Sequence, residues 1–290
     1  MMSSAGGGMI ESRRVLGLGD SSVVIHAAGV VGRRLLDRLF DGEDSAGVPP
    51  PRVRFEIREP DREGLLGLWR DDVLYWAGEA EGELAGRILD RTLFDIGDVC
   101  RAGPLLHAAA VVREGRAIVL AGPSGCGKTT LVAWLLSRGL DYQSDELVFV
   151  SPDGATVQAY PRPLMIKKES LDLLRARLDL PAHVEREGYV SRSARVLLLP
   201  ARCLTRRPVV TTAKLGCVVF PRRVGHGPCE LKPVSRALAA VRLMASLLNA
   251  RNLPGHGAAI VARLARVLPV YELSYSDIGQ VGGELERLIP

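Results

Sequence analysis

The amino-acid sequence predicts an α/β protein in which a smaller α+β domain precedes the main domain. A short apolar run at residues 117–120 leads into a glycine-rich loop, and an apolar stretch at helical spacing follows, which is typical of a strand–loop–helix unit. Further apolar runs at 147–150 and 215–220 indicate additional strands. The 290 residues, 47% of them hydrophobic, can bury a substantial core, and we expect two domains, residues 1–100 and 101–290.

Composition and charge argue against several classes of protein. No stretch approaches the roughly 18 consecutive apolar residues that a membrane-spanning helix needs, and residues 1–14 lack the apolar centre of a signal peptide. We therefore expect a cytoplasmic protein with no membrane partner. The five cysteines form no Cys-x-x-Cys pair, which disfavours a disulfide framework and a zinc site. The net charge of +5 is modest and no basic stripe with interleaved aromatic residues is visible, so we expect no nucleic-acid partner.

The first hundred residues carry strand and helix patterns but no catalytic motif. Apolar runs and alternation predict strands at 15–18, 23–26, 53–57 and 73–76, helical spacing predicts an amphipathic helix at 31–40, and 79–93 stays open between helix and strand. We interpret this part of the chain as a small α+β domain that supports the main domain or docks a substrate.

A β-hairpin is predicted directly before the glycine-rich loop. Residues 105–112 are apolar, 113–116 form a turn, and 117–120 supply the second arm. His107 lies at the start of the first arm. A histidine at the edge of an apolar run is more often a core residue than a catalytic one, so both interpretations of His107 stay open.

The loop matches the phosphate-binding pattern of Gly, four free positions, Gly, Lys and then Ser or Thr. Glycines let successive N–H groups point inward, which makes an anion site at the start of the following helix. Lys128 would reach the β- and γ-phosphates, and the Thr129 hydroxyl would ligate Mg²⁺. We therefore expect the nucleotide to be bound by Gly122, Pro123, Ser124, Gly125, Cys126, Gly127, Lys128, Thr129 and Thr130. The alternative, a glycine-rich turn without a ligand, fits the strand–turn–helix setting less well.

Two adjacent acids follow soon after the helix that leaves this loop. Asp145 and Glu146 stand at the start of the apolar run 147–150, where one could face Mg²⁺ and the other a substrate hydroxyl. An exposed acidic turn is the alternative, and the short distance from the loop helix favours a functional role. Further on, Arg162 lies between two prolines, where it could clamp a phosphate or a carboxylate, or stay solvated.

The remaining patterns describe packing rather than chemistry. They predict a helix at 170–178 capped by Ser170. The basic segment at 183–207 is either a solvated face or a substrate-gripping loop. Strands are predicted at 215–220 and 270–275, and helices from Ser235, around 260–268 and around 278–288 at the C-terminus.

At this point the sequence resembles a known family. The run from His107 to Val112, the hairpin, the loop at 122–130 and the segment Ser144-Asp145-Glu146 are similar to the catalytic core of the HPr serine kinase/phosphorylase family. More narrowly, the chain resembles compact HPr-kinase-like proteins encoded beside peptide natural-product genes, including lasso-peptide clusters. It has Glu146 where the full-length kinases usually have Asp, and their Glu-Ile-Arg-Gly signature is not found.

The resemblance implies a P-loop kinase core of the HPr-kinase-like type that uses ATP and Mg²⁺. It implies that Asp145 is the base toward an acceptor serine, that Lys128 and Thr129 hold phosphates and Mg²⁺, and that His107 lies near the phosphates. The metal ligands would then be Thr129, Asp145 and Glu146. We expect transfer of the γ-phosphoryl group to a Ser or Thr hydroxyl of a peptide or protein, a natural-product precursor peptide being one candidate. An ATP-binding accessory or scaffold protein, a P-loop ATPase and a small-metabolite kinase stay open, as does the oligomeric state.

Overall fold

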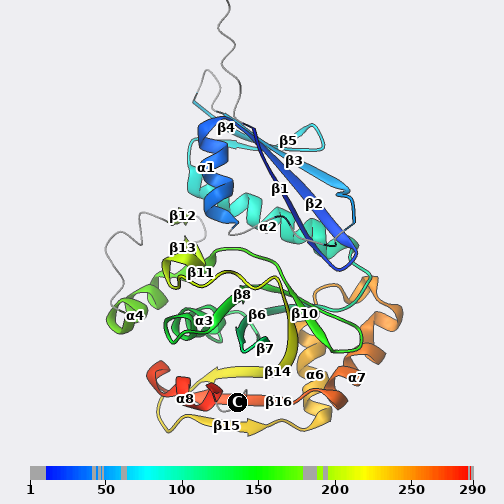
Figure 1. The fold of residues 1–290 in the computed structure, drawn as a ribbon, viewed down its shortest axis with the longest axis vertical. Helices are drawn as coiled ribbons and strands as arrows, with labels where there is room; N and C mark the ends of the chain where they lie inside the picture. The colour runs from blue at the N-terminus through cyan, green and yellow to red at the C-terminus, as the bar shows by residue number, and fades with distance from the viewer. Residues whose placement is uncertain are drawn as a thin grey trace, which may run out of the picture.

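The computed structural model describes residues 11–40, 44, 47, 49–59, 64–178, 188–191, 195–286 and 288. It has a mixed α/β fold with a five-stranded sheet, an eight-stranded sheet and a small three-stranded sheet. Figure 1 places the five-stranded sheet, built from the start of the chain, above the larger sheet that the rest of the chain forms. Within these residues no helix combines the length and apolar character needed to cross a membrane.

The five-stranded sheet follows the order of its strands in the chain. It consists of β1 (Glu11–Leu18), β2 (Ser21–Ala28), β3 (Val53–Arg58), β4 (Leu66–Arg70) and β5 (Val73–Gly78). The β2–β3 pair is parallel, and α1 (Gly29–Leu39) is the crossover helix that a parallel pair requires. Together with α2 (Glu81–Val99), α1 covers one face of this sheet (Figure 1). Phe55 and Ile57 are buried on that face, which explains why they alternate with charged residues.

Most of the N-terminal elements agree with the sequence patterns. The four predicted strands and the amphipathic helix are confirmed, and the segment left open at 79–93 is helical as part of α2. Strand β4 was not predicted, because its five residues include a glycine that breaks the alternation. This glycine, Gly67, faces Trp69, and a Cβ atom there would lie 2.9 Å from the Trp69 indole nitrogen.

The larger sheet carries the predicted hairpin and loop. Its strands are β6 (Leu105–Arg113), β7 (Arg116–Ala121), β8 (Asp141–Ser144), β9 (Leu147–Val150), β10 (Thr156–Ala159), β14 (Thr212–Arg223), β15 (Glu230–Pro233) and β16 (Val270–Tyr275). Their order is β10-β9-β6-β7-β14-β16-β15, with β8 paired to β6. Strand β10 also pairs with the start of β14, so the sheet curls back on itself. Strands β7, β14 and β16 are parallel, and their carboxyl ends therefore meet at one edge.

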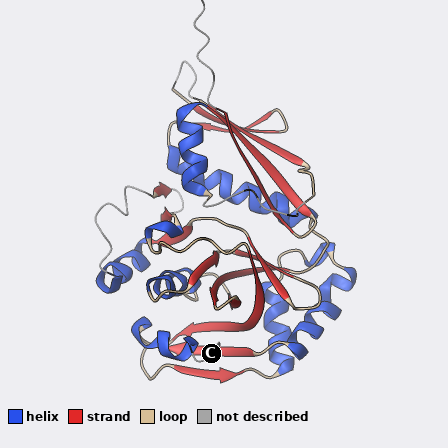
Figure 2. Cartoon of the chain, viewed as in Figure 1, coloured by secondary structure: helices blue, strands red, loops and turns tan. Residues whose placement is uncertain are grey.

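Helices cover both faces of the larger sheet (Figure 2). Ile118 and Leu120 of β7 pack with α3 (Lys128–Ser137) on one face. Ala117 and Val119 pack with α6 (Arg236–Ser246) and α7 (Ala258–Val267) on the other. A strand buried on both faces is apolar along its whole length, which is why residues 117–120 formed a continuous apolar run.

The third sheet lies beside α3 and holds the segment after Arg162. It contains β11 (Leu164–Lys167), β12 (Tyr189–Ser191) and β13 (Val196–Leu199). The other helices of the described residues are α4 (Lys168–Leu178) and α8 (Val281–Glu286). Four short helices complete the described part of the chain: η1 (Ala201–Cys203), η2 (Ala250–Asn252), η3 (Pro254–Gly257) and η4 (Ile278–Gln280). Helix α4 begins at Lys168, directly after β11, so Ser170 lies inside the helix and the predicted cap is wrong. In contrast, Ser235 caps α6 by accepting the Leu238 N–H at 3.4 Å. Residues 183–187 and 192–194 of the predicted basic segment lie outside the described residues.

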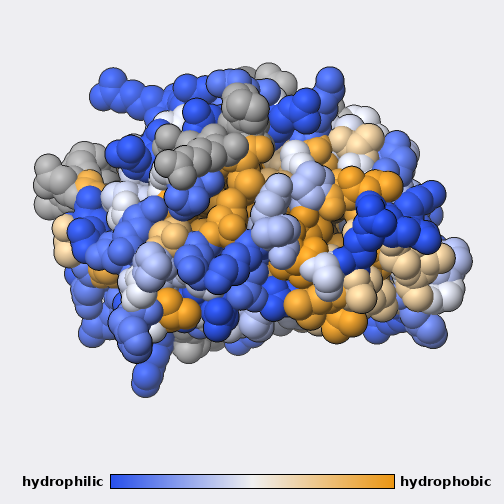
Figure 3. Space-filling view, turned by 90° about the horizontal axis from the view of Figure 1, so that it is seen from below, coloured by the Kyte–Doolittle hydropathy of each residue, from blue (hydrophilic) through white to orange (hydrophobic). Residues whose placement is uncertain are grey.

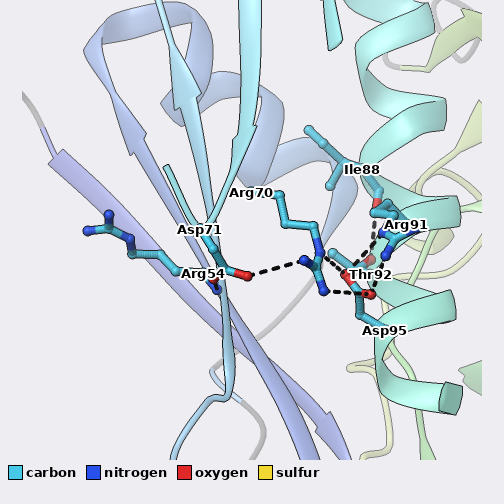
Figure 4. Close-up of polar contacts among 7 residues, drawn as sticks. All are labelled: Arg54, Arg70, Asp71, Ile88, Arg91, Thr92 and Asp95. Atoms are coloured by element: carbon cyan, nitrogen blue, oxygen red, sulfur yellow. Dashed lines mark hydrogen bonds and ion pairs between the residues drawn. The ribbon is translucent and has the colours of Figure 1, made fainter. Parts of the chain in front are cut away.

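A cluster of charged residues ties α2 to the five-stranded sheet. Asp95 of α2 is 5% exposed and accepts hydrogen bonds from Arg70 of β4 at 3.0 and 3.2 Å. It also accepts bonds from Arg91, one turn earlier in the same helix, at 3.2 and 2.7 Å. Figure 4 shows both guanidinium groups directed at this one carboxylate. The buried negative charge is therefore fully compensated.

The two larger sheets share apolar packing and polar contacts. Tyr160, which follows β10, is fully buried and its hydroxyl is hydrogen-bonded to the Thr92 hydroxyl of α2. Its ring meets Phe40 edge to face, with the centroids 6.4 Å apart. The Asn249 side chain, after α6, donates to the carbonyls of Cys100 and Gly103 at 3.0 and 2.9 Å. One apolar cluster accordingly includes residues from both parts of the chain.

Candidate functional site

The glycine-rich loop joins β7 to α3 at the edge where the parallel strands end. Gly122, Gly125 and Gly127 have φ angles of 143°, 87° and 100°, a region that strains residues with a side chain. At Gly127 there is also no room, because a Cβ atom would lie 2.7 Å from the Tyr275 hydroxyl oxygen. The glycines of the pattern are thus required by the path of the backbone.

Lys128 folds back over this loop. Its ammonium group donates to the carbonyl oxygens of Gly122 at 2.8 Å and Pro123 at 3.2 Å, and the side chain is only 5% exposed. The positive charge therefore lies against the loop, next to the N-terminus of α3, where the helix dipole also favours an anion.

Thr129 and Asp145 form a direct hydrogen-bonded pair. The Thr129 hydroxyl lies 3.0 and 3.1 Å from the two carboxylate oxygens of Asp145, which also accepts the Met165 N–H at 3.1 Å. Asp145 is 0% exposed. Burial, followed by the charge of Glu146, raises the pKa of Asp145 to about 6, although these hydrogen bonds and Arg162 act in the opposite direction.

Glu146 brings His107 into the site. The residue occupies the turn between β8 and β9 with a φ of 99°, and its carbonyl accepts the Ala108 N–H of β6 at 3.2 Å. Its carboxylate lies 3.2 Å from His107 Nδ1. Burial lowers the pKa of His107, and Lys128 adds to this, whereas Glu146 opposes it. His107 is therefore half-buried and in contact with the acid that follows Asp145, and its role stays a prediction.

Arg162 is buried rather than solvated. Its side chain is 3% exposed, one terminal nitrogen lies 2.6 Å from the Met165 sulfur, and Nε has no hydrogen-bond partner. Among the described residues no carboxylate forms an ion pair with it. Tyr142 fixes the backbone here by donating to the Arg162 carbonyl at 2.5 Å. A buried cation without a counter-ion is costly, and an anionic ligand would compensate it.

Cavities lie on both sides of the loop. One of about 380 Å³ is lined by Lys128, Thr129, Glu146, Met165 and Lys167 among others. Another of about 730 Å³ is lined by the first half of the loop, His107, the end of β14 and part of α6. Ser124 and Gly125 border both cavities. A third cavity, of about 170 Å³, lies between the loop, α4 and the segment after β16.

The oxygen donors beside Lys128 suit Mg²⁺. Thr129 supplies a hydroxyl, while Asp145 and Glu146 supply carboxylates. Mg²⁺ is usually held by one or two carboxylates together with phosphate oxygens and water, so the set fits a magnesium–nucleotide complex. Within the described residues no group of three or more His, Cys, Asp or Glu side chains is placed to hold a metal by itself.

Several residues of the site gave no usable signal in the sequence. Met165 contributes a backbone N–H to Asp145, which does not depend on its side chain. Tyr275 packs on Gly127 from the end of β16, far along the chain. Arg222 and Arg223 did carry a signal, because charged residues directly after an apolar run mark the carboxyl end of a strand, where ligands bind in open α/β sheets.

Comparison with known proteins shows distant structural similarity. No protein-family model matches the chain, and no curated protein matches it. Among solved structures the chain is similar to the Hpr(Ser) kinase/phosphatase from Coxiella burnetii, with 11% identity and a TM-score of 0.32, covering 64% of this chain and 93% of that one. Because a likeness at this level identifies no family, function has to be inferred from the site.

Proposed function

We propose that this protein is an ATP- and Mg²⁺-dependent kinase that transfers the γ-phosphoryl group to a Ser or Thr hydroxyl of a peptide or protein. One observation carries the proposal: the hydroxyl of Thr129 is hydrogen-bonded to Asp145, immediately beside a buried Lys128 in a glycine-rich loop. This combination of a cation, a hydroxyl and a carboxylate at a helix N-terminus suits a metal-bound polyphosphate.

Each charged group has a task toward the phosphates. The loop N–H groups cradle the phosphate chain, and Lys128 exchanges its two carbonyl partners for phosphate oxygens. Arg162, which is buried and forms no ion pair among the described residues, supplies a second positive charge. Mg²⁺ held by Thr129 and Asp145 would neutralise charge on the transferred group.

The two acids differ in access, and we assign their roles accordingly. Asp145 is completely buried against Thr129, which suits a metal ligand. Glu146 lines the 380 Å³ cavity and is held by His107, which suits a base that meets the acceptor. The assignment implied by the family resemblance, with Asp145 as the base, is the alternative, and the variants in the Discussion separate the two.

These groups account for every bond and proton in the transfer. The acceptor oxygen forms a bond to the γ-phosphorus, and the bond from the γ-phosphorus to the β–γ bridging oxygen breaks. ADP leaves with the bonding electrons, and the proton of the acceptor hydroxyl passes to a Glu146 carboxylate oxygen. His107 holds that carboxylate through Nδ1. The side chains thus position, orient and deprotonate, which is most of what phosphoryl transfer asks of a protein.

The test is a transfer assay with γ-labelled ATP and a panel of Ser- and Thr-containing peptides. We expect label on a peptide with wild-type protein and none with Lys128→Ala. Nucleotide binding without label on any acceptor would instead support an accessory or scaffold protein. Release of inorganic phosphate without labelled acceptor would support an ATPase, and labelling of a small alcohol alone would support a metabolite kinase.

A further inference from the structure

The 730 Å³ cavity next to the loop differs in its lining residues from the cavity that contains Lys128 and Thr129. We call it the acceptor cavity and define it by His107, residues 122–126 of the loop, the end of β14 at 220–223, residues 242, 245 and 246 of α6, Leu248 and Glu272. Its volume is within the range of cavities that hold small molecules or short peptide segments. It opens on the opposite side of the loop tip from the cavity that contains Lys128 and Thr129.

One wall of the acceptor cavity is apolar. Phe220 and Pro221 contribute from β14, and Ala245 and Leu248 contribute from α6 and the residues after it. Leu248 is 46% exposed although it borders the cavity. In Figure 3, apolar surface gathers in the middle and right of the lower face, the side on which Figure 1 places α6 and α7. This wall therefore offers contact area to an apolar side chain of a ligand.

The rest of the acceptor cavity has an excess of positive charge. Glu272 is shared by Arg242 at 2.6 Å and Arg222 at 3.2 Å, and these arginines lower the pKa of Glu272. The Arg242 guanidinium also lies over the Phe220 ring, 5.4 Å from its centroid, which fixes its orientation. Arg223 lines the cavity as well, and among the described residues no carboxylate pairs with it. Three arginines and one carboxylate thus border the acceptor cavity, and Arg223 also borders the 170 Å³ cavity.

The His107–Glu146 pair connects this cavity to the phosphates. His107 borders the acceptor cavity, while Glu146, 3.2 Å away, borders the cavity that contains Lys128 and Thr129. A hydroxyl that enters past His107 therefore arrives where the proposed base and the terminal phosphate meet. Adenine is uncharged and would leave Arg223 without an anionic partner, so the cavity suits an anionic ligand better than a nucleobase.

We propose that the acceptor cavity binds the substrate and selects peptides in which the acceptor Ser or Thr is flanked by a carboxylate and an apolar side chain. The carboxylate pairs with Arg223 and the Arg222–Arg242 pair, and the apolar side chain packs on Phe220 and Leu248. This specificity presupposes the kinase function proposed above, although binding can be measured without turnover.

The experiment compares four single-serine peptides that share an apolar residue beside the serine. Three are acetylated and amidated and carry Glu, Gln or Lys next to the serine, and the fourth carries Gln and ends in a free carboxylate. Binding is followed by fluorescence anisotropy in the presence of a non-hydrolysable ATP analogue, and transfer by kcat/KM. We expect the Glu peptide to exceed the amidated Gln and Lys peptides by about tenfold or more in both. Preference for the fourth peptide instead would identify a chain terminus as the source of the carboxylate.

Arg223→Glu provides the matched change of charge. We expect it to abolish the preference for the Glu peptide and to favour the Lys peptide, while KM for ATP stays unchanged. Arg266→Gln, at an exposed position of α7, controls for the loss of a surface arginine. Equal binding of all four peptides by wild-type protein would overturn the proposal, and so would an Arg223→Glu effect on ATP rather than on peptide. If peptides bind selectively but are never phosphorylated, the kinase function fails and the binding specificity stands.

Discussion

Two buried aspartates, one in each part of the molecule, differ in what surrounds their charge. Asp95 of α2 accepts four hydrogen bonds from two arginines, at 2.7 to 3.2 Å (Figure 4). Among the described residues, Asp145 beside the loop accepts hydrogen bonds only from a hydroxyl and a backbone N–H, and the next residue in the chain is another acid, Glu146. The first charge is compensated by two ion pairs inside the fold, whereas the second interacts electrostatically with Arg162 but forms no ion pair among the described residues.

The contrast separates a structural carboxylate from a functional one. A buried ion pair with satisfied hydrogen bonds costs little to keep but much to break, because removal of one partner leaves the other uncompensated. A buried carboxylate with neutral hydrogen-bond partners lowers the free energy of unfolding, and the raised pKa of Asp145 reflects this cost. A bound metal–nucleotide complex would remove that cost. Substitution of Asp95 should therefore lower stability and leave activity intact, whereas substitution of Asp145 should stabilise the ligand-free protein and lower activity.

The largest expected effect is on activity. Asp145→Asn should lower the rate of transfer by about a thousandfold and weaken the dependence on Mg²⁺, because it removes a proposed metal ligand. Glu146→Gln should lower the rate by about a hundredfold with an unchanged Mg²⁺ requirement, because it removes the proposed base. Initial rates over a Mg²⁺ titration measure both. The reverse pattern would assign the base to Asp145, and Asp95→Asn, assayed below its unfolding temperature, should retain wild-type activity.

The next effect is on the stability of the N-terminal sheet. Asp95→Asn should lower the free energy of unfolding by about 3 kcal/mol, because Arg70 and Arg91 lose their shared carboxylate. Urea unfolding followed by circular dichroism measures the change. Asp90→Asn, at an exposed position of the same helix, is the control and should change stability little. Equal effects of the two variants would show that the buried cluster does not stabilise the fold.

At Asp145 the same type of substitution should stabilise the protein without ligand. Because the pKa is raised from 3.8 to about 6, the folded state binds more protons than the unfolded state between these values, and stability falls as the pH rises through this window. Asp145→Asn removes this cost and should raise the free energy of unfolding at pH 7 by about 3 kcal/mol. Below about pH 4 the gain should vanish, since the carboxyl is then protonated in both states. Urea midpoints at pH 4 and pH 7, without Mg²⁺ and nucleotide, test this; a gain that is independent of pH would contradict it.

The smallest effect concerns the contact that joins the two regions. Tyr160→Phe removes the hydroxyl that is bonded to Thr92, whose own hydroxyl still donates to the Ile88 carbonyl at 2.7 Å. We expect a loss of about 1 kcal/mol in the free energy of unfolding, without the full penalty of an unsatisfied group. A double-mutant cycle with Thr92→Val isolates the pair, and additive losses would show that the two hydroxyls do not stabilise each other.

The sequence predicted the elements that are long or chemically marked. The loop at 122–129, the strand before it, the helix after it and the helix that begins near Ser235 follow local rules, so residues close in the chain suffice to identify them. The short strands β4, β8, β10, β11, β12, β13 and β15 were missed, because three to five residues carry little periodicity. The roles of Asp145, Glu146 and Arg162 remain predictions, to be decided by the variants described above.

What the local patterns could not supply is the environment of each charge. Whether Arg162 is buried depends on the path of the chain from β10 to β11, which places Met165 against it. Whether His107 is a core residue depends on the turn that brings Glu146 to within 3.2 Å of it. The compensation of Asp95 needs an arginine from a strand 25 residues earlier. Such long-range neighbours are set by tertiary packing, which a single sequence does not display.

The buried ring of Tyr160 links the first hundred residues to the segment that carries Arg162. It stands two residues before Arg162, and it is wedged against Phe40 and Thr92 from the N-terminal part of the chain. A protein shortened to residues 101–290 would expose the Tyr160 ring to water. The segment from Tyr160 to Arg162 would then lack its contacts with Phe40 and Thr92. The N-terminal region thus holds in place the segment between β10 and β11, which leads to Met165 in the lining of the 380 Å³ cavity.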